Sequence, residues 1–283
     1  MNYRHAFHAG NHGDVLKHVV LTRVLSYMTA KDKSFRLLDA HAGIGRYDLS
    51  GPEAFKTGEW RDGIGRLLDE QPSGEERALL APYLSIVERM NPGGPIRHYC
   101  GSPEIAARML RQQDKIVLNE LHPQDCATLT ANYAGDRRVR VTNVDAVRAV
   151  KAELPFPERR GVVLLDPAYE SADDSSDLVR MVEHITLRMA QTVVLAWYPV
   201  KSEKFVADLL DRVKRLNFPG LLHIQLIVKE VHESAGLAGS GLLVFNPPWV
   251  LADECKTLLP FLSRVLSKGK WGRSTVDWLT PPL

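Results

Sequence analysis

The 283-residue sequence lacks features that define several classes of protein. It has only three cysteines, Cys100, Cys126 and Cys255, and this odd, widely spaced set provides neither a disulfide framework nor a zinc cluster. The longest apolar runs, such as residues 162–165 and 193–197, are far shorter than the roughly 20 residues that span a bilayer. The first five residues contain no apolar signal-peptide stretch. We therefore expect a cytoplasmic protein without a membrane segment.

The sequence also lacks a large excess of either charge, because 36 Lys+Arg and 34 Asp+Glu leave a net charge of +2. The charges are unevenly placed, however, and both residues 1–36 and residues 264–283 are basic. Basic ends suit a polyanion such as nucleic acid, although a solvated surface without a partner gives the same pattern. A hydrophobic content of 45% is ordinary for globular proteins and excludes a disordered chain.

Short apolar runs alternate with helical patterns along most of the chain. Strands are expected at 35–39, 115–120, 139–144, 161–166, 192–197, 221–228 and 241–245. Helices are expected at about 13–27, 102–112, 124–133, 173–190, 202–216 and 252–266. This alternation, with nearly continuous apolar strands, predicts an α/β fold with a parallel sheet that helices cover on both faces.

One stretch, from about residue 47 to residue 100, interrupts the alternation. It contains three Gly- and Pro-rich breaks and two helix-like segments, at about 53–70 and 75–90. We expect residues 1–283 to form a single domain in which this stretch is a helical insertion after the first strand. Such insertions commonly shape substrate access.

Four of the expected strands end in a carboxylate: Asp39, Glu120, Asp145 and Asp166. Ligands of parallel sheets bind at the carboxyl ends of the strands. At Glu120 an acid can accept hydrogen bonds from ribose hydroxyls, and a plain surface acid is the alternative. Asp145, followed by Ala146, can accept from an adenine amino group or cap the next helix, and the two roles are compatible.

A glycine-containing turn follows the first expected strand, as Asp39-Ala-His-Ala-Gly43-Ile-Gly45. Its glycines let the backbone approach a ligand closely. The turn resembles the Asp-x-Gly-x-Gly loop that holds S-adenosylmethionine in methyltransferases, with His41 where such loops often have glycine. Gly-rich turns also close many other βα units.

The most specific motif is Asp166-Pro167-Ala168-Tyr169, directly after the fourth expected strand. It resembles the Asp-Pro-Pro-Tyr motif of methyltransferases that act on the amino group of adenine or cytosine. The Asp166 carboxylate and the Pro167 carbonyl would accept the two N–H bonds of the amine, and Tyr169 would stack on the extruded base. Ala168 replaces the second proline, which puts the rigidity of the loop in doubt.

Four histidines lie between residues 5 and 18. Their spacings of 3, 4 and 6, across a stretch broken by glycines, complete no known metal-site pattern, so we predict no metal. His12 and Asp14 could simply cap a helix that starts near Val15.

The same amino-terminal stretch carries a family resemblance. Residues 3–18 read Tyr-Arg-His-Ala-Phe-His-Ala-Gly-Asn-His-Gly-Asp-Val-Leu-Lys-His, which resembles the opening signature of the ribosomal RNA large subunit methyltransferase J family. Further similar stretches are Thr57-Gly58-Glu59, Gly101-Ser102-Pro103, Glu120-Leu-His-Pro123, Arg160-Gly161, Ala196-Trp-Tyr-Pro199 and Gly241 through Asn246-Pro-Pro-Trp249. The resemblance covers essentially the whole chain.

This resemblance implies a Rossmann-like class I methyltransferase that methylates N6 of one adenine, adenine 2030, of 23S rRNA with S-adenosylmethionine. The implied cofactor-binding residues are His18, His41, Gly43, Ser102, Glu120, Asp145, Ala146 and Asp166. Asp166, Pro167 and Tyr169 would be catalytic, and Tyr3, Arg4 and Lys17 would contact RNA, Lys17 through a phosphate. On the residues alone, His18 could be a buried helix histidine and Tyr3 a frayed end.

The expected substrate is 23S rRNA that is protein-free or early in assembly, and the expected enzyme is a monomer without an obligate protein partner. Two alternatives remain open at this point. A DNA adenine methyltransferase shares the Asp-Pro-x-Tyr motif, although the insertion of about 50 residues is small for a DNA recognition region. A non-catalytic RNA-binding protein on the same fold would be expected to have lost Asp166.

Overall fold

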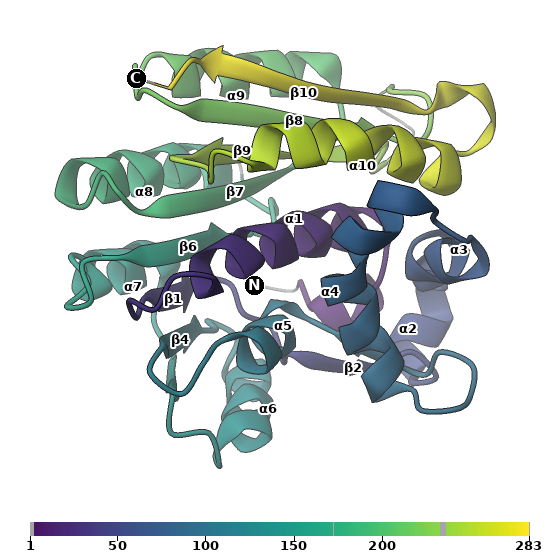
Figure 1. The fold of residues 1–283 in the computed structure, drawn as a ribbon, viewed down its shortest axis with the longest axis horizontal. Coiled ribbons are helices and arrows are strands. Elements are labelled where there is room, and N and C mark those ends of the chain that lie inside the picture. The colour runs from purple at the N-terminus through teal and green to yellow at the C-terminus, as the bar shows by residue number, and fades with distance from the viewer. Residues whose placement is uncertain (1–2, 172, 233–235, 283) are drawn as a thin grey trace.

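A computed structural model describes residues 3–171, 173–232 and 236–282 (Figure 1). Its centre is an eight-stranded sheet with the strand order β10-β8-β9-β7-β6-β1-β4-β5. The strands are β1 (Arg36–Asp39), β4 (Lys115–Asn119), β5 (Val139–Thr142), β6 (Gly161–Leu165), β7 (Val193–Val200), β8 (Leu221–Ile227), β9 (Gly239–Phe245) and β10 (Arg273–Thr280). The predicted α/β class is confirmed, and β10 is a strand that the sequence patterns did not indicate.

The sheet consists of a parallel half and an antiparallel half. β5, β4, β1, β6 and β7 run parallel to one another, whereas β9 runs antiparallel to β7 and β8, and β10 runs antiparallel to β8. The prediction of a purely parallel sheet is therefore wrong beyond β7. Strands buried on both faces carry the same apolar run in either direction, so the sequence pattern contained no information on orientation.

Helices cover both faces of the sheet and enclose two apolar cores. One face carries α1 (His12–Thr29), α5 (Ser102–Met109) and α10 (Leu251–Leu266), with α6 (Pro123–Tyr133) beside β5. The other face carries α7 (Ala146–Glu153), α8 (Asp174–Arg188) and α9 (Glu203–Lys214). No helix of the described residues is long and apolar enough to cross a membrane.

The insertion lies between β2 (Arg46–Asp48) and β3 (His98–Cys100), which pair antiparallel as a small second sheet. It contains α2 (Pro52–Thr57), the 3-10 turn η2 (Glu59–Asp62), α3 (Ile64–Asp69) and α4 (Gly74–Met90). The predicted single helix at 53–70 is wrong because Gly58, with a φ of +63°, ends α2 in a left-handed conformation. Helix α4 contributes Tyr83 and Ile86 to the core that α1 shares.

The amino-terminal segment reaches the sheet through the 3-10 turn η1 (His5–Phe7) and α1. The side chain of Asn11, rather than His12 or Asp14, caps α1 by accepting from the Asp14 N–H at 3.0 Å. Helix α1 then begins at His12, one residue before the expected 13–27 and three residues before the start near Val15 that the capping alternative assumed. This arrangement frees the Asp14 carboxylate for other contacts.

Candidate functional site

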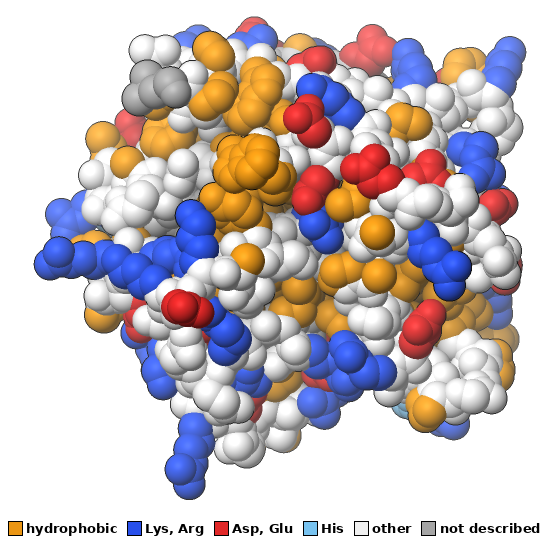
Figure 2. Space-filling view, in the orientation of Figure 1, with side chains coloured by type: hydrophobic (Ala, Val, Ile, Leu, Met, Phe, Trp, Pro, Cys, Tyr) orange, Lys and Arg blue, Asp and Glu red, His pale blue; other side chains and the backbone are white. Residues whose placement is uncertain are grey.

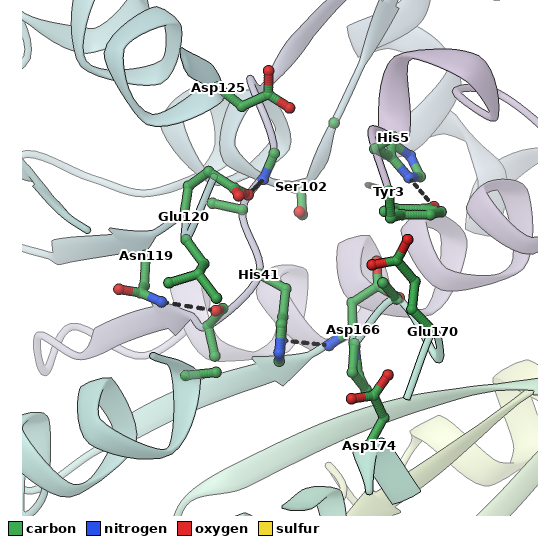
Figure 3. A pocket seen from close by; sticks show the side chains of 18 of the residues that line it. Tyr3, His5, His41, Ser102, Asn119, Glu120, Asp125, Asp166, Glu170 and Asp174 are labelled. Atoms are coloured by element: carbon green, nitrogen blue, oxygen red, sulfur yellow. Dashed lines mark hydrogen bonds between the residues drawn. The ribbon is translucent and has the colours of Figure 1, made fainter. Parts of the chain in front are cut away.

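A cavity of about 330 Å³ opens at the carboxyl ends of β1, β4, β5 and β6, and the amino-terminal segment closes one side of it (Figure 3). Eleven of the thirteen residues predicted for the site line this cavity: Tyr3, Lys17, His18, His41, Gly43, Ser102, Glu120, Asp145, Ala146, Asp166 and Pro167. Arg4 and Tyr169 do not. The structure thus brings together in one cavity residues that are up to 164 positions apart in the chain.

Asp166, directly after β6, is held from two sides. Its backbone N–H donates to Nδ1 of His41 at 3.1 Å, and its Oδ2 accepts from the Lys17 ammonium. Burial lowers the pKa of His41 to about 4, so the ring is neutral at pH 7, and because Nδ1 accepts, its proton lies on Nε2. Both partners fix the position of the carboxylate in the cavity.

Lys17 belongs to a buried chain of polar contacts. Its ammonium lies 2.8 Å from Oδ1 of Asp14, whose Oδ2 accepts from the Gly10 N–H and contacts Nε2 of His5, each at 2.8 Å. Burial alone would lower the pKa of Lys17, but Asp14 and Asp166 outweigh it and raise this pKa. The Lys17 side chain is only 4% exposed, which does not favour the predicted phosphate contact.

Tyr3 continues this chain at the wall of the cavity (Figure 3). Its hydroxyl lies 2.9 Å from Nδ1 of His5, and its ring stacks on His8 with centroids 5.5 Å apart. Burial, followed by the negative charge of Asp166, raises the pKa of Tyr3. Tyr3 is therefore a fixed wall of the cavity and not a frayed end.

Glu120, directly after β4, lies across the cavity from Asp166 (Figure 3). Its Oε2 accepts from the Gly43 N–H and its Oε1 from the His122 N–H, each at 2.8 Å. Burial raises the pKa of this carboxyl group. Because each carboxylate oxygen has two lone pairs, the group keeps acceptor capacity for a ligand hydroxyl on both oxygens.

The Gly43 position admits only glycine. Its φ is +60°, and a Cβ there would lie 2.3 Å from the Tyr47 hydroxyl. The turn after β1 therefore keeps its backbone open toward the cavity, as the sequence indicated.

Asp39, the acid at the start of this turn, is fully buried and stabilises the fold around the cavity. Its oxygens accept from the Ser102 hydroxyl at 2.6 Å and the His41 N–H at 3.2 Å. Burial raises the pKa of Asp39 to about 6. Ser102 thus lines the cavity at the start of α5 with its hydroxyl already donated to the protein.

Asp145 caps α7 with one oxygen, since Oδ1 accepts from the N–H groups of Val147 and Arg148 at 3.0 and 3.3 Å. The capping alternative is therefore realised. Its Oδ2 has no hydrogen bond within the described part of the chain, so a second role toward a ligand stays compatible with capping. Ala146, the first residue of α7, lines the cavity beside it.

Tyr169 is turned away from the cavity. Its hydroxyl donates to the carbonyl of Trp197 at 2.9 Å, and its ring packs edge-on against Trp197 and Phe205. Its backbone φ of +53° is rare for any residue other than glycine. Arg4 also points elsewhere, to Asp125 at 3.1 Å and to Glu53 at 3.7 Å.

His18 is 1% exposed and bonds to the Tyr99 hydroxyl at 2.8 Å, which in turn contacts the Tyr83 hydroxyl. Burial lowers its pKa to about 3. His18 is thus a buried helix histidine that reaches the cavity wall. The described residues contain no group of three or more side chains that could hold a metal ion.

Sequence reasoning missed several residues of this site. Asn119, at the end of β4, joins the loops after β1 and β5 by donating to the carbonyls of Ala40 and Val144. Asp14 contacts Lys17, and His5 contacts Asp14. Four more acids line the cavity: Asp125, Glu170, Asp174 and Asp177. The sequence offered one signal for these missed residues: in Asn119-Glu120 a polar residue stands before the acid at the end of a strand.

The sheet carries three features at the carboxyl ends of its parallel strands: a Gly turn after β1, an acid after the neighbouring β4 and an Asp-Pro after β6. Together they define a class I S-adenosylmethionine-dependent methyltransferase. The family described as "Ribosomal RNA large subunit methyltransferase D, RlmJ" matches residues 32–280. The chain belongs to this family, and its cofactor is S-adenosylmethionine.

Two relatives named "Ribosomal RNA large subunit methyltransferase J" align over 99% of both chains. The protein of Haemophilus influenzae is 42% identical and that of Escherichia coli is 38% identical. A solved structure of a Legionella pneumophila protein, 30% identical, superposes with a TM-score of 0.87 over 95% of this chain and 98% of its own. The similarity therefore covers both the sheet and the insertion.

Proposed function

We propose that this protein methylates N6 of a single adenine in 23S rRNA, at the position that its family resemblance implies. The observation that carries the proposal is the carboxylate of Asp166, fixed in the cavity by Lys17 and His41 and followed directly by Pro167. Two acceptors beside one another are what an exocyclic amine with two N–H bonds requires.

The cavity fits the cofactor. Gly43 lines the cavity without a side chain, and Glu120 offers acceptor positions suited to the two ribose hydroxyls. The acids that line the cavity suit a ligand with a sulfonium and an ammonium group. When bound, the cofactor supplies an electrophilic methyl group.

The residues of the chain prepare the adenine amine. Oδ1 of Asp166 has no hydrogen bond from the described residues and would accept one N–H, while the Pro167 carbonyl would accept the other. Holding both bonds directs the nitrogen lone pair toward the methyl group. After transfer, the proton that the nitrogen loses passes to Asp166.

Tyr169 would need to leave Trp197 to stack on the base. The positive φ of its backbone and the single hydrogen bond of its hydroxyl make a second position of the side chain accessible. We propose this stacking role together with the RNA contact of Tyr3, which lies beside Asp166 at the cavity wall. We also propose that the active form is a monomer.

The test is methyl transfer from labelled S-adenosylmethionine to three substrates in parallel: unmodified protein-free 23S rRNA, intact large subunits and adenine-containing duplex DNA. We expect label in one N6-methyladenine of protein-free 23S rRNA. Asp166→Asn keeps the shape but lacks the charge, and should lower kcat by at least a thousand-fold while cofactor affinity stays within a few-fold.

The matched control is Asp253→Asn, an exposed acid of α10 paired only with Lys256, which should keep wild-type kcat. Label in DNA would favour the alternative substrate. RNA binding without any transfer would favour a non-catalytic protein. Full activity of Asp166→Asn would refute the acceptor role.

A further inference from the structure

An exposed aromatic side chain lies on the insertion, beside the amino-terminal segment that closes the cavity, in a region that we call the rim. Phe55, on α2 of the insertion, is 70% exposed, although a phenylalanine normally gains stability from burial. Its neighbour Lys56 is also exposed and lies over the ring of Phe7 at 5.8 Å. A base can stack on an exposed aromatic face, and a nearby cation can contact the phosphate that follows it.

Helix α2 is tied directly to the segment that closes the cavity. The Thr57 hydroxyl donates to the carbonyl of Phe7 in η1, and Glu53 contacts Arg4 at 3.7 Å. Tyr3, next to Arg4, is a wall of the cavity. A chain that leaves the cavity past Tyr3 therefore meets α2 next.

The charges of this rim favour an anionic partner. Its acids already have partners, because Glu59 bonds to His8 and Asn11, and Asp62 contacts Arg66 and Lys268. The cations Lys56 and Arg61 have no carboxylate partner in the part of the chain that the structure describes. Arg61 lies over the ring of Trp60 at 5.2 Å, with its guanidinium exposed.

The same surface continues into the carboxy-terminal basic stretch. Asp62 accepts from Lys268 at 2.6 Å, and the 3-10 turn η4 (Gly269–Trp271) follows. There Lys270 lies over the exposed ring of Trp271 at 5.2 Å. Figure 2 shows Lys and Arg side chains projecting at the upper right, on the side where the α10–β10 connection lies in Figure 1.

The amino-terminal basic stretch, in contrast, offers little to a polyanion. Lys17 is buried, Arg23 is paired with Glu254, and Arg36 is paired with Glu153 and Glu158. Of the two explanations that the sequence left open, these pairings favour the one without a polyanion for most of the cations in residues 1–36.

We infer that Phe55, Lys56, Arg61, Lys270 and Trp271, which we call the rim surface, bind the single-stranded RNA on one side of the target adenine. Unpaired bases stack on Phe55 and Trp271, and the three cations contact the phosphates. Single-stranded RNA fits better than a duplex because exposed aromatic rings need unstacked bases. The inference rests on the proposed function and adds to it the surface on which the RNA substrate docks.

The test measures the dissociation constant of a labelled, adenine-containing single-stranded RNA and the KM for unmodified 23S rRNA. Phe55→Ala should weaken binding and raise KM by about ten-fold, with unchanged kcat and cofactor affinity, whereas Phe55→Tyr should bind as wild type. Lys56→Ala and Arg61→Ala should each reduce the slope of log affinity against log salt by about 0.7.

Two control variants lie at the amino ends of the parallel strands, opposite the strand ends that form the cavity. Trp249 is 77% exposed and follows β9, whose last residue, Phe245, pairs with Val194 and Leu221 at the starts of β7 and β8. Lys33 is exposed just before β1. Trp249→Ala and Lys33→Ala should leave the RNA affinity and the salt slope unchanged.

Equal RNA affinity for Phe55→Ala and Trp249→Ala would overturn the inference about the rim surface. If the wild type still methylates 23S rRNA in that case, the proposed function stands. A wild-type dimer that Phe55→Ala converts to a monomer would assign the rim surface to a second copy of the chain and overturn the inference too. Failure of the wild type to bind or methylate any RNA would instead overturn the proposed function.

Discussion

The two ends of the cavity hold their carboxylates by different means. Glu120 accepts from two neutral backbone N–H groups, of Gly43 and His122. Asp166 accepts from a fully charged ammonium, which is itself buried against Asp14. A carboxylate held by neutral donors can still bind neutral hydroxyls. A carboxylate in a buried ion pair depends on every charged group of that pair, here Asp14, Lys17 and Asp166. A change at Glu120 should therefore remain local, and a change around Asp166 should spread.

The largest expected effect comes from breaking the ion pair. Lys17→Met removes the cation that Asp14 and Asp166 share, and the buried Asp14 carboxylate keeps the Gly10 N–H and His5 but loses its ammonium partner. The free energy of unfolding should therefore fall by about 3–5 kcal/mol. Urea denaturation at pH 7 measures this. Lys256→Met, which removes an exposed pair on α10, should cost at most about 1 kcal/mol. Similar losses for the two variants would contradict the comparison.

At the Glu120 end of the cavity, a substitution should change the affinity for the cofactor. Glu120→Gln replaces one acceptor oxygen by a donor that faces a backbone N–H and removes the charge, so the dissociation constant for S-adenosylmethionine should rise at least ten-fold, equivalent to about 1.5–3 kcal/mol. Titration calorimetry gives this constant. Because Glu120 is held by backbone donors alone, stability should change less than for Lys17→Met. Unchanged affinity would remove Glu120 from the cofactor site.

Acid should weaken the Asp166 end through its neutral histidine. As the pH falls below about 6.5, an unfolded chain protonates His41. The folded chain resists until about pH 4, because burial lowers this pKa. The free energy of unfolding should therefore fall with decreasing pH in this window, by up to about 1.4 kcal/mol per pH unit from His41.

His41→Asn should remove that part of the slope. His98→Asn, at an exposed position of β3, controls for the loss of a histidine and should leave the slope as it is in the wild type. Urea denaturation between pH 4 and pH 7 measures the three slopes. A slope for His41→Asn equal to that of the wild type would show that this ring titrates alike in both states.

The sequence predicted most of the parallel half of the fold, because buried strands that end in acids combine two strong local signals. As expected, Asp39 is the last residue of β1, and Glu120 and Asp166 directly follow β4 and β6. The antiparallel half was harder to predict, since orientation depends on packing and not on local pattern. Strand β10 was missed because its alternation of Ser, Thr, Val, Asp and Trp is mostly polar and half-exposed.

For the site, the sequence identified the residues but not their partners. Spacing could not reveal that Lys17 and Asp166 meet, because 149 positions separate them. Nor could it show that Tyr169 points to Trp197, since side-chain direction follows from packing against α9 and β7. Tyr3, Lys17 and His18 of the stretch at residues 3–18 line the cavity, but local pattern did not distinguish a phosphate contact from a buried ion pair at Lys17.

The long separation between Lys17 and Asp166 has a consequence for synthesis on the ribosome. Lys17 and Asp14 emerge together, but Asp166 follows only after a further 149 residues. At about 5–20 residues per second this takes roughly 7–30 s. During that interval the amino-terminal helix lacks the strands that bury it, so nascent chains would display an exposed apolar helix that chaperones can hold. The chemistry of the enzyme can begin only after the middle of the chain has been translated.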